Sequence, residues 1–156
     1  MPIIATQTHL YYGSVALSMI HQKWDNQDMN YWHKYNPNPL ENRVEDCVQR
    51  AISAALDVDW DTASDMVHDM AKSMGLPEHT DAAWGAILRR NGFYRAIIPN
   101  TCPDCFTVAD FCREHPHGVY VLKTTGHVVT VIDGQVWDTW DSTGEIPIYF
   151  FYRRYE

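Results

Sequence analysis

The sequence predicts an α+β domain in which N-terminal helices pack on an antiparallel β-sheet. Apolar residues recur at helical spacing between residues 46 and 90, whereas the last third is rich in Val, Ile, Tyr, Phe and Trp, as strands are. Asp133-Gly134 lies between two of these β-rich runs and is the strongest short-range signal for a hairpin. Helices followed by an antiparallel meander are typical of the α+β class.

The helices are expected over 46–56, 62–74 and 81–90, with a fourth that Thr107 caps and that ends near His115. The first follows from the spacing of Val48, Ala51, Ile52 and Ala55. Gly75 supplies the C-terminal stop of the second, and Thr80 is the expected cap of the third. A further short helix is expected near residues 14–22.

Strands are expected over 93–98, 119–123, 127–132, 135–140 and 146–152. The segment Asn36-Pro37-Asn38-Pro39 predicts a turn, because each proline disfavours the helical conformation in the residue before it. We therefore divide the chain into an N-terminal extension over 1–36 and a domain over 37–156. The extension is interpreted either as a cover for a cleft or as a docking segment.

Composition excludes several classes of function. The 156 residues include 12 Lys+Arg and 20 Asp+Glu, which gives a net charge of −8, and no basic run exceeds two residues. This argues against a nucleic-acid phosphate binder. No apolar stretch is long enough to span a bilayer, and the early apolar run lacks the features of a signal peptide. The four cysteines therefore indicate thiols, a metal site or a nucleophile in a cytoplasmic protein.

Cys47 is expected at the start of its helix, directly after Glu45-Asp46. The unpaired N–H groups and the positive end of the helix dipole favour the thiolate there, and the same N–H groups suit an oxyanion. The two preceding carboxylates oppose this, because they raise the pKa of the thiol unless a base lies close. The alternative interpretation is a small buried apolar residue.

The predicted hairpin places a base and a carboxylate together. With Asp133-Gly134 as a two-residue turn, Val129 faces Asp138, so His127 and Asp138 are diagonal neighbours on one face of the sheet. Asp138 is then the residue that orients and charges the imidazole. The alternative is that His127 is an exposed polar residue and that Asp138 caps a loop.

The order of a helix-borne Cys, a strand-borne Gly-His and an Asp on the next strand resembles the papain-like superfamily of cysteine peptidases and amidases. Over residues 35–154 the chain also resembles a group of small uncharacterised proteins from phages and mobile elements of Gram-positive bacteria. The runs that carry this second resemblance are Tyr35-Asn36-Pro37-Asn38-Pro39, Asn42-Arg43-Val44-Glu45-Asp46-Cys47, Cys102-Pro103-Asp104-Cys105, Gly126-His127-Val128-Val129 and Asp138-Thr139-Trp140-Asp141-Ser142.

The papain-like resemblance implies roles for individual residues. Cys47 would be the nucleophile, His127 the general base and later the acid, and Asp138 the orienting residue. Papain-like enzymes place a Gln upstream of the Cys to complete the oxyanion hole, and no Gln occupies residues 40–46 here. Asn42 is the amide in that window and would take this role beside the backbone N–H of Cys47.

A second set of residues has zinc-type spacing. Cys102 and Cys105, followed by Cys112 and His115, offer four ligands, so zinc is a possible cofactor. The alternatives are a labile Cys102–Cys105 pair or an ordinary turn, with Cys112 in the core.

The leading hypothesis is a papain-like cysteine hydrolase or acyltransferase that acts on an amide, isopeptide or thioester bond in a protein or peptide substrate. The alternative is an acidic binding protein of a phage or mobile element that inhibits a host defence factor with a degenerate papain-like fold, since a net charge of −8 suits a basic partner surface. A third is a zinc-stabilised interaction module.

Overall fold

The structure is a computed structural model that describes residues 29–42 and 44–153. The compact unit that contains the candidate site begins at Tyr31. This differs from the expected boundary after residue 36, because β1 (Trp32–Lys34) is already a strand of the sheet. The helix expected over 14–22 lies outside the described residues.

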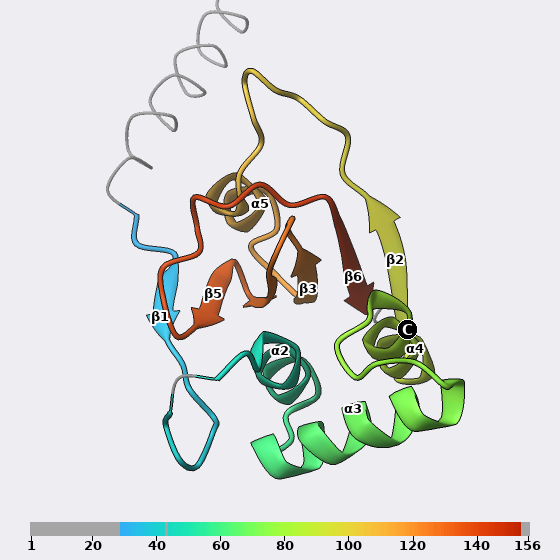
Figure 1. Cartoon of the computed structure of the whole chain (residues 1–156). Coiled ribbons are helices and arrows are strands. Elements are labelled where there is room, and N and C mark those ends of the chain that lie inside the picture. Colours follow the sequence, from blue (N-terminus) through green and yellow to red (C-terminus); the bar gives the residue numbers. More distant parts are fainter. Residues whose placement is uncertain (1–28, 43, 154–156) are drawn as a thin grey trace, which may run out of the picture. The chain divides into compact units, whose positions relative to one another are not determined.

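In the described part of the chain, four helices and a six-stranded sheet form an α+β fold (Figure 1). The strands lie in the order β1-β5-β4-β3-β6-β2. All neighbours are antiparallel except β1, which runs parallel to β5 (Gln135–Asp138). The remaining strands are β2 (Phe93–Ile97), β3 (Val119–Lys123), β4 (Val128–Ile132) and β6 (Tyr149–Arg153).

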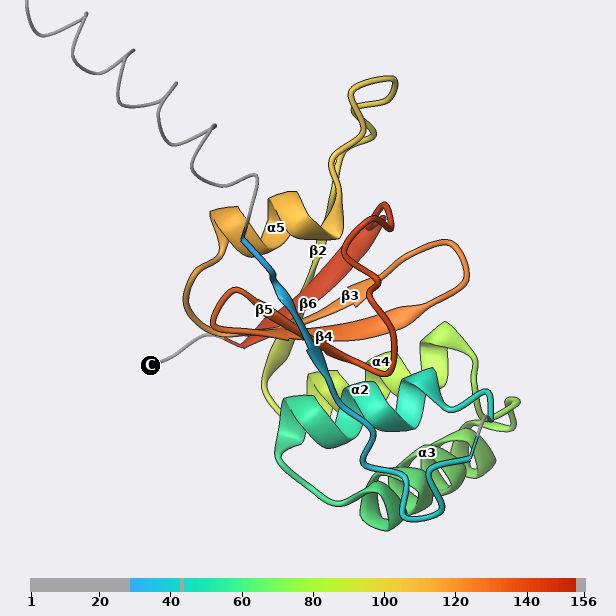
Figure 2. The same cartoon turned by 90° about the vertical axis from the view of Figure 1, so that its left-hand side faces the viewer.

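The helices cover both faces of this sheet, as Figure 2 shows. One face packs against α2 (Cys47–Leu56) and α4 (Asp81–Arg90), and α3 (Trp60–Met74) packs on these two helices, in a core that includes the fully buried Trp84. The other face packs against α5 (Val108–Glu114), around Phe111. The central strand β3 therefore buries residues on both of its faces, with Val121 in the first core and Leu122 in the second, whereas the edge strands β1 and β2 are largely exposed.

Local sequence determines where the helices begin. Asp59 accepts a hydrogen bond from the Thr62 N–H at 2.7 Å, so α3 starts at Trp60, slightly before the expected residue 62. Thr107 and Asp110 form a reciprocal capping box at the start of α5, and this confirms the expected cap. Thr80 occupies the N-cap position of α4, but its hydroxyl donates to the Pro77 carbonyl instead of capping the helix.

The predicted hairpin is confirmed together with its register. Asp133 and Gly134 both have positive φ, 48° and 71°, as a type I′ turn requires. Ile132 pairs with Gln135 and Thr130 with Trp137. β5 ends at Asp138 and not at the expected residue 140, because the Asp138 carboxylate accepts the Thr139 N–H at 2.7 Å.

Candidate active site

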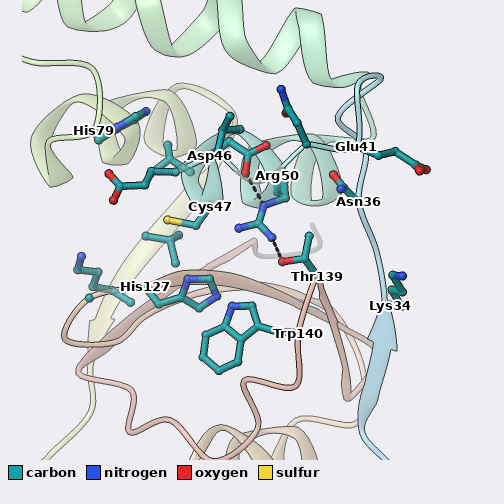
Figure 3. Close-up of a pocket in the computed structure, with 17 residues that line it drawn as sticks. Lys34, Asn36, Glu41, Asp46, Cys47, Arg50, His79, His127, Thr139 and Trp140 are labelled. Atoms are coloured by element: carbon teal, nitrogen blue, oxygen red, sulfur yellow. Dashed lines mark hydrogen bonds and ion pairs between the residues drawn. The ribbon is translucent and has the colours of Figure 1, made fainter.

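Cys47 is the first residue of α2, and its half-buried side chain borders a cavity of about 810 Å³ (Figure 3). The N-cap residue Asp46 makes no side-chain cap hydrogen bond, so the N–H groups of the first turn are not satisfied by the side chain that usually caps them. The local sequence thus places a thiol at the positive end of a helix dipole. This is the position that the sequence predicted.

His127 and Asp138 lie next to each other where β4 begins and its neighbour β5 ends. His127 immediately precedes β4, Asp138 is the last residue of β5, and the hairpin register brings these positions together. The imidazole Nε2 and the Asp138 Oδ2 lie 2.5 Å apart, and both side chains are buried. The same ring lies close enough to the Cys47 thiol for the two groups to shift each other's pKa. The structure therefore brings Cys47, His127 and Asp138 into one connected chain of side chains.

Electrostatics in this chain favour an ion pair between sulfur and imidazole. Burial opposes the charged thiolate, but hydrogen bonds from His127 and from the Val128 backbone, together with the charges of His127 and Arg50, outweigh burial and lower the pKa of Cys47. Burial likewise opposes the imidazolium, yet Asp138 and Cys47 raise the pKa of His127 to about 9. The two shifts therefore favour a thiolate beside an imidazolium over a neutral thiol beside a neutral imidazole.

The Asp138 carboxylate accepts hydrogen bonds from four groups. Oδ1 accepts from the guanidinium of Arg50 at 3.0 Å and from the Thr139 N–H, while Oδ2 accepts from Ser142 Oγ at 2.8 Å and contacts His127. Four partners in different directions leave the carboxylate one orientation. This fixes the plane and tilt of the imidazole that it contacts.

Sequence reasoning missed Arg50 and Ser142. Ser142 lies four residues after Asp138 in a short irregular segment, and Arg50 lies three residues after Cys47 on α2. A serine that follows an aspartate at this spacing is a weak signal of a local hydrogen bond. An arginine on the same helix face as the candidate nucleophile is a stronger one, because residues three apart are neighbours on a helix.

Asn42, the expected oxyanion donor, lies on the wall of the cavity. Its Oδ1 accepts a hydrogen bond from Asn38 Nδ2 at 3.1 Å, which leaves the Asn42 Nδ2 group as the donor that this side chain can offer to a ligand. Trp140 lines the cavity beside the base, with its ring centroid 5.0 Å from that of His127.

The four residues that the sequence suggested as zinc ligands do not lie together in the structure. Cys102 and Cys105 form a disulfide in the loop between β2 and α5. Cys112 lies on the buried side of α5 in the second core, and His115 stacks on Phe111. Burial raises the pKa of Cys112 to about 12. Within residues 29–42 and 44–153, no group of three His, Cys, Asp or Glu side chains is arranged to hold a metal ion.

Within the same ranges, no helix combines the length and apolarity needed to cross a membrane. Comparisons of the chain with models of protein families, with curated proteins and with solved structures found no match.

Proposed function

We propose that this protein is a papain-like cysteine hydrolase or acyltransferase that acts on an amide, isopeptide or thioester bond. The observation that carries the proposal is the chain of interacting side chains from Cys47 at a helix N-terminus, through His127, to the buried carboxylate of Asp138, which hydrogen-bonds the imidazole. A nucleophile, its base and the group that orients the base are the three parts that covalent acyl transfer requires.

In the proposed reaction, the Cys47 thiolate attacks the carbonyl carbon, and the carbonyl π electrons move onto the oxygen. The backbone N–H of Cys47 and the Asn42 amide stabilise the resulting oxyanion. As the oxyanion collapses, the bond to the leaving amine or thiol breaks, and the His127 imidazolium gives its proton to that group. A thioester on Cys47 remains, and His127 is neutral.

The second half of the reaction reverses these proton movements. Neutral His127 takes a proton from water or from an acceptor amine, which attacks the thioester carbonyl. Collapse of the second oxyanion then releases the acid or the transferred product and restores the thiolate beside the imidazolium. Asp138 remains ionised throughout and orients the ring.

The test is the pH dependence of iodoacetamide labelling, followed by intact mass, for the wild type and for His127→Ala. We expect Cys47 to react at pH 6 much faster than an ordinary thiol, whose pKa is about 8.5, and the rate to fall in the variant. Buried Cys112 and the disulfide-bonded cysteines are internal controls, because none of them offers an accessible thiolate. Cys47→Ala verifies the labelled position.

Acylation provides the second readout. With p-nitrophenyl acetate as a generic acyl donor, we expect a transient acetylated species that is absent in Cys47→Ala. A wild-type labelling midpoint near that of an ordinary thiol, with no acyl species, would contradict the proposal. A host-factor inhibitor would then be the better hypothesis, and its effect would survive Cys47→Ala.

A further inference from the structure

Arg50 is a buried cation between two buried carboxylates, and its position links the two halves of the candidate site. Its Nη1 lies 3.0 Å from Asp138 Oδ1 and also donates to the Thr139 hydroxyl. Its Nε lies 3.0 Å from Asp46 Oδ1. That second contact is an ion pair and not an aligned hydrogen bond, because the Nε lacks a partner with hydrogen-bond geometry. Figure 3 shows the guanidinium between Asp46 and Thr139, beside Cys47.

Asp46 presents an electrostatic difficulty for the nucleophile. It directly precedes Cys47 and is buried, so its negative charge opposes the formation of a thiolate on the next residue. Its carboxylate does not cap α2; Oδ2 instead accepts hydrogen bonds from Trp60 and Asn38. Something must offset this charge for Cys47 to ionise readily, and Arg50 is the cation in contact with it.

We propose that Arg50 is a positioning residue of this site, which offsets the charge of Asp46 beside Cys47 and ties the helix of the nucleophile to the carboxylate that orients His127. The inference rests on the proposed function and explains how the thiolate tolerates a neighbouring aspartate. Removal of Arg50 would leave two buried carboxylates near a thiolate, with the imidazolium as the remaining contacting cation. The positive charge of Arg50 itself favours the thiolate, as the lowered pKa of Cys47 reflects.

Other charged groups line the cavity that the thiol borders. His127 contacts it directly, and Lys123, at the end of β3, lines the same cavity while pairing with Asp81 at 3.5 Å. The remaining charged or titratable groups of the cavity wall are Lys34, Glu41, Glu45 and His79. None of these contacts Asp46 in the described ion pairs, whereas Arg50 does.

The experiment is the pH profile of Cys47 labelling by iodoacetamide in a charge cycle of wild type, Arg50→Gln, Asp46→Asn and the double variant. We expect the midpoint to rise by about one pH unit in Arg50→Gln, so that labelling at a pH well below the wild-type midpoint slows about tenfold. Asp46→Asn should lower the midpoint, and the double variant should return toward the wild-type value. Arg50→Lys keeps the positive charge but loses the forked set of guanidinium donors. Its midpoint should therefore lie closer to the wild-type value than to that of Arg50→Gln.

The matched control is Arg113→Gln. It removes another arginine–aspartate pair, with Asp110 at 2.6 Å, from the helix on the other face of the sheet. Its midpoint should equal that of the wild type. A purely structural role for Arg50 would lower stability in urea without moving the labelling midpoint.

An unmoved midpoint in folded Arg50→Gln, or no return in the double variant, would overturn the inference. If Arg50→Gln does not fold, Asp46→Asn decides, because this near-isosteric change must lower the midpoint if the charge balance is as proposed. The proposed function can fail separately. If the wild-type thiol is activated and its midpoint depends on Arg50, but no acyl species forms, the enzymatic function is rejected and the role of Arg50 is retained.

Discussion

Asp138 contacts its neighbours through both its carboxylate and its backbone carbonyl. Its carboxylate accepts from Arg50, Thr139 and Ser142 as well as facing His127. Its backbone carbonyl accepts from the Trp32 indole at 3.1 Å and from the backbone N–H of Tyr35 at 2.8 Å. One residue thus joins the edge strand, the nucleophile helix and the base, so a change that weakens its contacts affects all three.

Ser142→Ala tests this role of Asp138. The Ser142 hydroxyl is fully buried and donates to the carboxylate at 2.8 Å, so its loss should cost about 1.5–3 kcal/mol of the free energy of unfolding, the range for a hydrogen bond to a charged group. Urea unfolding measures this. Thr143→Ala is the control, because the Thr143 hydroxyl donates to the exposed Asp141 and its backbone contacts survive the change. Equal losses in the two variants would contradict the prediction.

At the scale of single elements, α5 depends on its cap more than the longer helices do. It has seven residues, which is too short for helix propensity alone to stabilise it. The Thr107 hydroxyl accepts from the Asp110 N–H, and the Asp110 carboxylate accepts from the Thr107 N–H at 2.9 Å. Phe111 then packs the helix into the second core.

Thr107→Ala should therefore destabilise the protein by about 1 kcal/mol, the usual cost of removing an N-cap side chain. Thr107→Ser keeps the hydroxyl and should stay close to the wild type. Thermal unfolding measures both. The pH profile of Cys47 labelling should not change in either variant, since α5 packs on the face of the sheet opposite α2. A shift of that profile in Thr107→Ala would refute the separation of the two faces.

At the scale of the whole molecule, stability depends on pH through His127. The pKa of His127 is raised, so its charged form stabilises the folded state: the contribution is complete below the ordinary imidazole pKa of 6.5 and is lost as pH rises toward about 9. The Cys47 thiol has a lowered pKa and titrates in the opposite sense. The two contributions must therefore be separated experimentally.

Cys47→Ala removes the competing titration and leaves the pairing of His127 with Asp138. In that background, His127→Gln should cost more stability at pH 5.5 than at pH 10, by on the order of 1 kcal/mol. Urea unfolding at the two pH values provides the comparison. A cost that is equal at both, or larger at pH 10, would show that Asp138 does not stabilise the imidazolium.

The sequence predicts features that depend on local interactions better than features that depend on residues far apart in the chain. The turn at Asp133-Gly134 is local, and it determined the register that places His127 against Asp138. β1 has three residues and no useful periodicity, and it pairs in parallel with a strand distant in the chain, so the sequence pattern alone places it in the extension. Arg50 is separated from Asp138 by 88 positions, and its role becomes visible only once both partners are placed.

The separation of the site residues along the chain has a consequence for biosynthesis. Cys47 leaves the ribosome well before His127 and Asp138 have been translated, and these two supply the hydrogen bond and charge that activate it. Because translation proceeds from the N-terminus, the nascent thiol lacks its base until most of the chain has been made. Under the proposed chemistry, a ribosome that stalls before residue 127 would carry an unactivated cysteine, so truncated products would lack acyl-transfer activity.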